Sequence, residues 1–298
     1  MSKELLGQAI MAVYDRLARG ELRPDDVLSL SQVKIGSPRH WIDGFMLRKG
    51  VEDDDARILR GFRKEHGAIL DVGAYWGYMA GSFRNAGATS PIVSFEPMPA
   101  HHACLDELRR IDGNYDFARF ALGNKPETVT LYGPVVNGKA LMGLNSVDGR
   151  IFDHYHKEHL VSLHGGEIAD APAYKVQLLV TPFATRLLDT VLASRRFGLL
   201  APFRVDTRRI AVLKVDVEGH EPHVLQGAAE TLARHRPLIM IESGNRNRAV
   251  AEQLTAAGYR YAEREGLKLA EKTGYSDAPN GFWFHSEQAC AYAALGLF

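Results

Sequence analysis

The segment LKVDVEGHE, residues 213–221, gathers several groups that can do chemistry at the end of a hydrophobic run. Asp216, Glu218 and His220 are candidates for a general base, which typically speeds proton removal by about 10² to 10⁴. Carboxylates at one edge also suit Mg²⁺, which prefers oxygen ligands. A polar turn is the third interpretation, because Pro222 can begin a helix whose N-terminus favours nearby acids. The segment alone leaves the base, the metal site and the turn open.

A second candidate group is DVGAYWG, residues 71–77, which follows another hydrophobic run. Gly73 and Gly77 would let the backbone turn sharply and approach a ligand where a side chain would block it. The spacing Gly-x-x-x-Gly lacks the middle glycine of the dinucleotide fingerprint, and this argues against a bound pyrophosphate. Asp71 suits an amino group or an ordered water better than a phosphate.

Two further strand ends extend this candidate site. Glu96, followed by Pro97, ends the run PIVSF, and a carboxylate there can accept both hydroxyls of a ribose. Ala121 and Leu122 belong to a small turn after a weaker run, where they would contact a base. We therefore expect a nucleoside to bind across these ends.

The sequence predicts a scaffold that brings such ends together. From Ala68 onwards, hydrophobic runs alternate with helical segments, which predicts an α/β fold with a mostly parallel sheet covered by helices on both faces. Ligands bind such sheets at the carboxyl ends of the strands. The predicted strands are AILDVG, SPIVSFE, YDFARFALG, TVTLYG, RRIAVLKVDV, PLIMIES, YRYAERE and GFWFHS. The predicted helices cover residues 78–86, 100–110, 182–194, 222–235 and 247–257.

Six segments resemble, in order, the FkbM-type S-adenosylmethionine-dependent methyltransferases over residues 66–244. They are DVGAYWGY, SFEP, FALGN, TRLLDTVL, LKVDVEGHEPHVLQGAAETL and RPLIMIE. The resemblance implies a class I methyltransferase fold, which is Rossmann-like and has a seven-stranded sheet. YRYAERE and GFWFHS would form its final antiparallel hairpin.

The resemblance also implies contacts to S-adenosylmethionine, with Asp216 near the methionine end and the transferring methyl group. The family usually has Asn-Ile where this chain has Tyr75-Trp76. The predicted cofactor-binding residues are Asp71, Gly73, Ala74, Tyr75, Gly77, Glu96, Pro97, Ala121, Leu122 and Asp216.

The sequence outside the resemblance predicts the domain organisation. Residues 1–64 are predicted to form an N-terminal helical extension, and residues 65–298 the methyltransferase domain. Residues 133–174 are too long for a plain connection and are predicted to be a lid-like insertion.

The composition limits the partners and the compartment. Lysine plus arginine equals aspartate plus glutamate at 36 each, so no net field favours nucleic acid or a membrane surface. The two cysteines lack CxxC spacing, which argues against a structural zinc site and a disulfide framework. The first residues lack a long apolar run, so we expect neither a signal peptide nor a membrane span there. We expect a cytoplasmic protein, and the sequence leaves homo-oligomer formation open.

These observations predict an S-adenosylmethionine-dependent O-methyltransferase acting on a hydroxyl of a small-molecule, carbohydrate or natural-product acceptor. Asp216, Glu218 and His220 are its catalytic candidates. An alternative within the same chemistry is Mg²⁺ bound by Asp216 and Glu242, which would end adjacent strands. A nicotinamide-dependent oxidoreductase and a non-catalytic nucleoside-binding assembly module are the alternatives from other classes.

Overall fold

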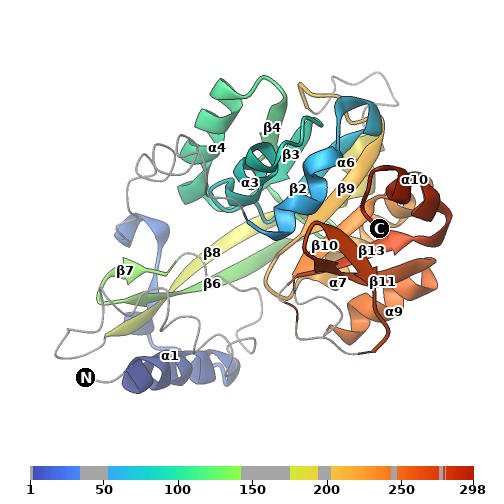
Figure 1. The fold of residues 1–298 in the computed structure, drawn as a ribbon. Coiled ribbons are helices and arrows are strands. Elements are labelled where there is room, and N and C mark those ends of the chain that lie inside the picture. The colour runs from blue at the N-terminus through green and yellow to red at the C-terminus, as the bar shows by residue number, and fades with distance from the viewer. Residues whose placement is uncertain are drawn as a thin grey trace. The chain divides into compact units, whose positions relative to one another are not determined.

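A computed structural model describes residues 3–33, 53–141, 175–193, 203–242, 247–274, 278 and 280–298. The chain divides into two compact units. Figure 1 shows the helices and strands, coloured by residue number. The smaller unit comprises Met1–Gly36 and Thr128–Phe183, and the larger comprises Ser37–Glu127 and Ala184–Phe298. All the predicted site residues lie in the larger unit.

The smaller unit packs one helix on a short sheet. Helix α1 (Lys3–Ala18) buries Leu6, Ile10, Val13 and Tyr14, a spacing that forms one helical face. These side chains share a hydrophobic cluster with residues of β6 (Thr128–Val136) and β8 (Val176–Arg186). The strand order is β1-β8-β6-β7, where β1 is Val27–Leu28 and β7 is Lys139–Ala140. Short 3-10 turns cover Pro24–Asp26 (η1) and Leu30–Gln32 (η2).

The larger unit contains an eight-stranded sheet in the order β12-β11-β13-β10-β9-β2-β3-β4 (Figure 1). The strands β4, β3, β2, β9 and β10 are parallel neighbours, whereas β13, β11 and β12 pair antiparallel. Their bounds are β2 Ala68–Val72, β3 Ile92–Phe95, β4 Tyr115–Ala118, β9 Ile210–Val215, β10 Leu238–Glu242, β11 Tyr259–Glu265, β12 Lys268–Glu271 and β13 Asn280–His285.

Helices cover both faces of this sheet, because alternate residues of the buried strands enter two separate hydrophobic clusters. One cluster joins the strands to α6 (Leu188–Ala193), α7 (Glu221–Gln226), α8 (Ala229–His235) and α9 (Arg248–Ala256). The other joins them to η4 (Asp55–Gly61), α3 (Tyr78–Ala86), α4 (Pro99–Ile111) and α10 (Ala289–Ala294). Two further 3-10 turns are η5 (Lys64–His66) and η8 (Ser286–Gln288).

The strand order reverses between β2 and β9. From β2 the chain continues to β3 and β4 on one side, whereas from β9 it continues to β10 on the other side. In an open α/β sheet the crevice at such a reversal is the usual ligand site. The carboxyl ends of β2 and β9 are therefore the expected place for a ligand site.

The mixed α/β fold with helices on both faces agrees with the prediction, but the sheet has eight strands where seven were predicted. β12 adds an eighth strand at one edge, and β13 lies between β10 and β11. The run TVTLYG forms β6, which belongs to the smaller sheet. The 259–265 and 281–286 runs do pair antiparallel, as β11 and β13.

Three helix predictions also differ from the structure. The first half of the predicted helix 182–194 is the end of strand β8, where buried and exposed residues alternate from Thr181 to Arg186. Pro182 suggested a helix start, but the alternation has the period of a strand. The predicted helix 222–235 is interrupted at Gly227 and Ala228, giving α7 and α8. Before β2, in the segment 1–64 that was predicted to be helical, residues Asp55–Gly61 form the 3-10 segment η4.

The units also divide the chain differently from the predicted boundary after residue 64. Residues 3–33 pack with β6 and β8, because β1 pairs with β8 and α1 shares their core. In the predicted insertion 133–174, residues 133–141 form the end of β6 and β7. Residues 142–174 lie outside the described residues.

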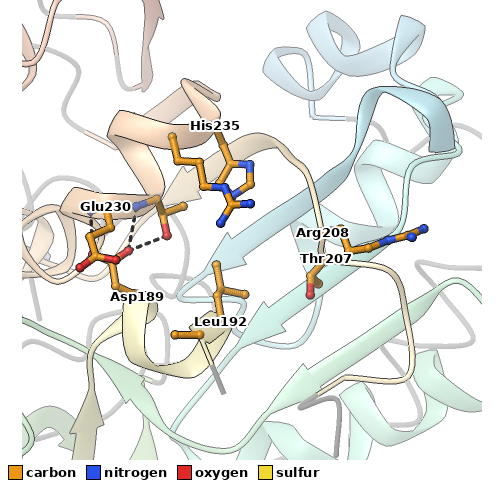
Figure 2. Close-up of a pocket in the computed structure, with 9 residues that line it drawn as sticks. Asp189, Leu192, Thr207, Arg208, Glu230 and His235 are labelled. Carbon is orange, nitrogen blue, oxygen red and sulfur yellow. Dashed lines mark hydrogen bonds between the residues drawn. The ribbon is translucent and has the colours of Figure 1, made fainter. Parts of the chain in front are cut away.

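Asp189 anchors α8 from the first turn of α6. Its carboxylate accepts hydrogen bonds from the backbone N–H groups of Glu230 and Thr231, each at 2.8 Å, and from the Thr231 hydroxyl at 2.6 Å (Figure 2). The first N–H groups of a helix have no partner within the helix, so an acid that accepts from them stabilises it.

Replacing this acid should therefore destabilise the larger unit. We expect Asp189→Ala to lower the free energy of unfolding by about 1–2 kcal/mol, measured by urea denaturation. Asp106→Ala is the matched control, because Asp106 is half-exposed and only pairs with Arg119 at the surface. The control should cost less than about 1 kcal/mol. Equal losses in the two variants would contradict the capping role.

Candidate active site

Four residues stand side by side at the carboxyl ends of four neighbouring strands. Val72, Phe95, Val215 and Ile241 are in register across β3, β2, β9 and β10. The next residues along the chain are Gly73, Glu96, Asp216 and Glu242. The sheet thus brings the glycine loop and three predicted acids to one rim, at the point where the strand order reverses.

The glycine loop touches the end of β9 through its backbone. Gly73 has φ +77°, and a Cβ atom added there would lie 1.7 Å from the carbonyl oxygen of Asp216. Gly73 and Ala74 both donate backbone hydrogen bonds to Phe95. At Gly77, φ is +85° and an added Cβ atom would lie 2.1 Å from the Leu108 side chain. Both glycines are therefore required by close packing and by conformation.

Tyr75 has a left-handed backbone, with φ 54°, which glycine adopts more easily than other residues. A left-handed backbone costs a residue with a side chain roughly 1–2 kcal/mol. Its N–H donates to Glu96 Oε2 at 2.8 Å, and its ring packs against the rings of Trp76 and His101 at centroid distances of 4.2 and 4.6 Å. The loop therefore keeps a glycine-like path although the sequence has no glycine at this position.

Glu96 ties this loop to the start of α4. Its Oε2 accepts from the Tyr75 N–H and its Oε1 accepts from the Met98 N–H, both at 2.8 Å. The His101 Nδ1 atom lies 3.3 Å from Oε1, and Glu96 is buried. Pro97 lies in the chain between Glu96 and Met98. Each carboxylate oxygen keeps a second lone pair, which is what a ribose hydroxyl would use.

Ala121 and Leu122 form the short strand β5, which pairs with Thr185 and Arg186 at the end of β8. Leu122 is buried in the hydrophobic cluster of the larger unit, and Ala121 is half-buried. The Leu122 side chain is therefore part of the core, and the exposed part of this turn is at Ala121.

Lys214 was absent from the predicted site, yet it joins three of its members. The Lys214 Nζ atom lies 3.2 Å from Asp71 Oδ1 and 3.3 Å from Asp216 Oδ2, and it donates a hydrogen bond to the Gly73 carbonyl at 2.9 Å. Asp71 is fully buried and Lys214 nearly so. Burial opposes the charged form, but the Asp216 and Asp71 carboxylates together raise the pKa of Lys214 above its ordinary value.

The loop after β9 is shaped by Glu221. Glu218 has φ 51° and Gly219 has φ 97°. The buried Glu221 carboxylate accepts from the backbone N–H groups of Val217 and Gly219 at 3.3 and 3.0 Å. Glu221 is thus more than an acid at a helix start, because it holds the turn that carries Glu218.

The carboxylates of Asp216, Glu218 and Glu242 converge. One oxygen of each lies within 4.8 Å of an oxygen of the other two. Repulsion from Asp216, followed by burial and by Glu218, raises the pKa of Glu242 well above its ordinary value. Such a cluster is relieved either by a proton or by a cation with oxygen ligands. Asp216 and Glu242, the two acids expected at the ends of adjacent strands, lie close together, and Glu218 lies with them.

His220 has a different environment from these acids. Its ring stacks on His223, with centroids 4.4 Å apart, and its Nε2 atom lies near Gly123 and Thr185. That buried nitrogen has no hydrogen-bond partner among the described residues. Burial, with a smaller contribution from His223, lowers the pKa of His220 to about 4. His220 is therefore neutral near pH 7.

A pocket of about 430 Å³ lies elsewhere in the larger unit (Figure 2). It is lined by α6, α8 and the residues Thr207 and Arg208, which precede β9. Strand β9 separates Arg208 from Asp216, and its six residues span about 20 Å. Two of its charged groups have local partners, since Asp189 accepts from the first turn of α8 and Arg208 pairs with Asp206 at 2.6 Å. This pocket is remote from the converging acids.

The fold and the rim define an α/β protein with a candidate ligand site at the strand-order reversal. Residues 71–261 match the family model described as Methyltransferase FkbM domain. This match covers more than half of the chain, from the glycine loop to β11. The chain belongs to the FkbM methyltransferase family, and the family implies use of S-adenosylmethionine. The family match gives no support for Mg²⁺.

Two solved structures are similar to the chain at low identity. One is Methyltransferase FkbM from Methylobacillus flagellatus KT, at 12% identity and TM-score 0.42, covering 84% of this chain and 50% of that structure. The other is Precorrin-6y C5,15-methyltransferase from Geobacter metallireducens GS-15, at 11% identity and TM-score 0.30, covering 88% of this chain and 97% of that one. The chain spans half the length of the first structure. No curated protein matches the chain.

The length and apolar character of the helices test whether one of them could span a membrane. Within the part of the chain that the structure describes, none of them has the length and apolar character needed to cross a bilayer.

The acid cluster predicts a pH-dependent gain in stability for Glu242→Gln. The folded state raises the pKa of Glu242, so wild-type stability falls as pH rises from about 4.3, the ordinary value, through the raised one. Glutamine keeps the shape and removes the charge. We expect equal melting temperatures near pH 4 and a higher one for the variant at pH 8. About 1 kcal/mol corresponds to roughly 2–4 °C for a domain of about 200 residues.

Glu252→Gln is the matched control, because Glu252 pairs with Arg248 on the exposed side of α9. Its melting temperature should follow the wild-type curve at every pH. A Glu242→Gln curve that also follows the wild type would show that the cluster is not strained.

Proposed function

We propose that the chain is an S-adenosylmethionine-dependent O-methyltransferase that acts on a hydroxyl of a small-molecule, carbohydrate or natural-product acceptor. The membership in the FkbM family supports methyl transfer. The observation that carries the site assignment is the convergence of Gly73, Glu96 and Asp216 at the strand-order reversal. Nucleoside ligands bind open α/β sheets at this point.

The strand order supports assigning the larger unit to the class I methyltransferase fold. Parallel strands β4, β3, β2, β9 and β10 are followed by β13, which is antiparallel and lies before β11. In this assignment the core has seven strands, and β12 is an addition at the edge.

Within this proposal the cofactor binds along the rim. The Gly73–Gly77 loop, with Ala74 and Tyr75, would lie against the methionine part, and Glu96 with Pro97 would receive the ribose. Ala121 and Leu122 would border the base, and Asp216 would lie near the reacting centre. The side chain of Asp216 is 36% exposed, so it is accessible to a ligand from the open side.

The chemistry asks the protein mainly for positioning. When bound, S-adenosylmethionine supplies an electrophilic methyl group on a good leaving group. Holding an acceptor oxygen in line can lower the barrier by roughly 7–11 kcal/mol. The acceptor proton needs a base, for which Asp216 and Glu218 are favoured by their place at the rim. His220 stays a candidate, although its low pKa makes it a weak base.

A Mg²⁺-assisted version stays a second proposal about the same reaction. Asp216, Glu218 and Glu242 present oxygen ligands close enough for one hard cation. A bound cation would acidify the acceptor hydroxyl. Activity that survives dialysis against EDTA would exclude this version.

Cofactor binding separates the proposal from the oxidoreductase alternative. We expect isothermal titration calorimetry to detect micromolar or tighter binding of S-adenosylhomocysteine and no binding of NAD at the same concentrations. The Gly-x-x-x-Gly loop lacks the spacing that admits a pyrophosphate, which is the physical reason for this expectation. NAD binding without S-adenosylhomocysteine binding would overturn the proposal.

A turnover assay separates the proposed methyltransferase from the alternative of a non-catalytic nucleoside-binding module. In an assay with labelled S-adenosylmethionine and a panel of hydroxyl acceptors, Asp216→Asn should lose at least about 100-fold in rate, as expected for a positioned base. Glu252→Gln, remote from the rim on α9, should keep full activity. Absence of transfer by the wild type with every acceptor would favour the module.

Expression in the cytoplasm is expected, as for a chain with only two cysteines.

A further inference from the structure

Lys214 is a cation inside an otherwise apolar strand. It lies between Leu213 and Val215 in β9, and all six residues of this strand are buried. It is in register with Asp71 of β2 and with Met240 of β10, so the three side chains share one face of the sheet. The neighbouring positions on that face are hydrophobic, among them Ile69 and Val212.

The surroundings of Lys214 use the whole ammonium group. An ammonium has three N–H donors. Its nitrogen has three acceptors nearby: the Gly73 carbonyl at 2.9 Å, Asp71 Oδ1 at 3.2 Å and Asp216 Oδ2 at 3.3 Å. The shortest contact is to the loop carbonyl. The Gly73 contact is a hydrogen bond and the two carboxylate contacts are ion pairs, so Lys214 acts on the site through the groups that it holds.

Stability is a weak reason for such an arrangement. A buried ion pair is often no more stable than apolar residues of the same volume, because both charges lose their hydration. Most of this face of the sheet is already hydrophobic. The charges at Lys214 and Asp71 therefore call for a purpose other than core packing.

Asp71 is placed to hold Lys214 and not to touch a ligand. Its exposure is 0%, and its other oxygen, Oδ2, accepts from the Ser94 hydroxyl of β3 at 3.3 Å. The amino group for which Asp71 is suited is thus supplied by the protein itself. This differs from the sequence-based expectation that Asp71 contacts the cofactor.

The other two contacts of Lys214 belong to the rim. The Gly73 backbone lies against the Asp216 backbone, and the Asp216 N–H donates to the Val72 carbonyl at 3.0 Å. Lys214 adds a side-chain link between the same two segments. It fixes one oxygen of Asp216, whose side chain is 36% exposed.

We propose that Lys214 is a positioning residue, which, held by Asp71, fixes the Gly73 loop and the Asp216 carboxylate in the geometry that binds S-adenosylmethionine. The inference deepens the proposed function and rests on it. The competing explanation is that Lys214 merely neutralises the buried Asp71. The two explanations differ in what happens when both charges are removed together.

The test uses three full-length variants: Lys214→Met, Asp71→Asn, and the double variant Lys214→Met/Asp71→Asn. Lys214→Met leaves Asp71 buried without its cation and is expected to unfold at a lower temperature or not to fold. The double variant removes both buried charges and should regain a cooperative melting transition. Asp71→Asn keeps the contacts of Lys214 to Gly73 and Asp216.

The first readout is the Kd of S-adenosylhomocysteine by calorimetry. We expect the double variant to bind at least about 10-fold more weakly than the wild type, because small displacements of a site cost large factors. Asp71→Asn should bind more tightly than the double variant, because Lys214 keeps its contacts with Gly73 and Asp216. A double variant that folds and binds as tightly as the wild type would overturn the proposal and favour charge neutralisation. A large loss in Asp71→Asn alone would return Asp71 to direct cofactor contact.

The second readout is hydrogen exchange of peptides covering residues 71–78, measured without cofactor. In the double variant these amides should exchange faster, whereas peptides from α9 should be unchanged. Unchanged exchange in the loop would overturn the positioning role. A wild type that binds no S-adenosylhomocysteine would instead refute the proposed function, and the exchange result would still decide whether Lys214 orders the loop.

Discussion

The contact between one buried ammonium and three acceptors organises the rim of the larger unit. Lys214 joins β2, β9 and the glycine loop at the point where the strand order reverses. Parallel strands supply a common edge, but they do not fix loops or side chains beyond that edge. Lys214, near the end of β9, provides this order, because it contacts Asp71 inside the sheet and Gly73 and Asp216 at the rim.

The rim also stores unfavourable interactions, as functional sites often do. Tyr75 and Glu218 have left-handed backbones, and three carboxylates converge at the ends of β9 and β10. Each of these features is held by a specific partner. Glu96 fixes Tyr75 through its N–H, and Glu221 fixes the turn that carries Glu218. The edge where a ligand is expected is therefore locally unfavourable. The hydrophobic clusters on both faces of the sheet stabilise the unit.

Much of the fold could be predicted from the sequence because its main signals are local. Helix α3 has the predicted bounds, and the ends of α4 and α9 lie within one residue of the prediction. The runs that form β2, β3, β9 and β10 are hydrophobic enough to be recognised as buried parallel strands. Strand β8 was missed because Pro182 suggested a helix start, and the eighth strand β12 because its four residues carry little hydrophobic signal.

The site was predictable to the extent that it depends on strand ends. Glu96, Asp216 and Glu242 each follow or end a recognisable run, so their approach at one edge follows from the strand order. The role of Lys214 does not follow, because the sequence cannot tell which face of β9 it occupies or that Asp71 lies beside it. The left-handed Tyr75 was likewise invisible, since the absence of a glycine argued against that backbone path.

The central claim is that the rim, and not the pocket of Figure 2, receives the cofactor. A crystal structure of the chain with S-adenosylhomocysteine tests it most directly. The account predicts ligand density against the Gly73–Gly77 loop, with the ribose hydroxyls at the Glu96 carboxylate and the sulfur facing Asp216. Density in the pocket beside Asp189 and Arg208, with the rim empty, would contradict it.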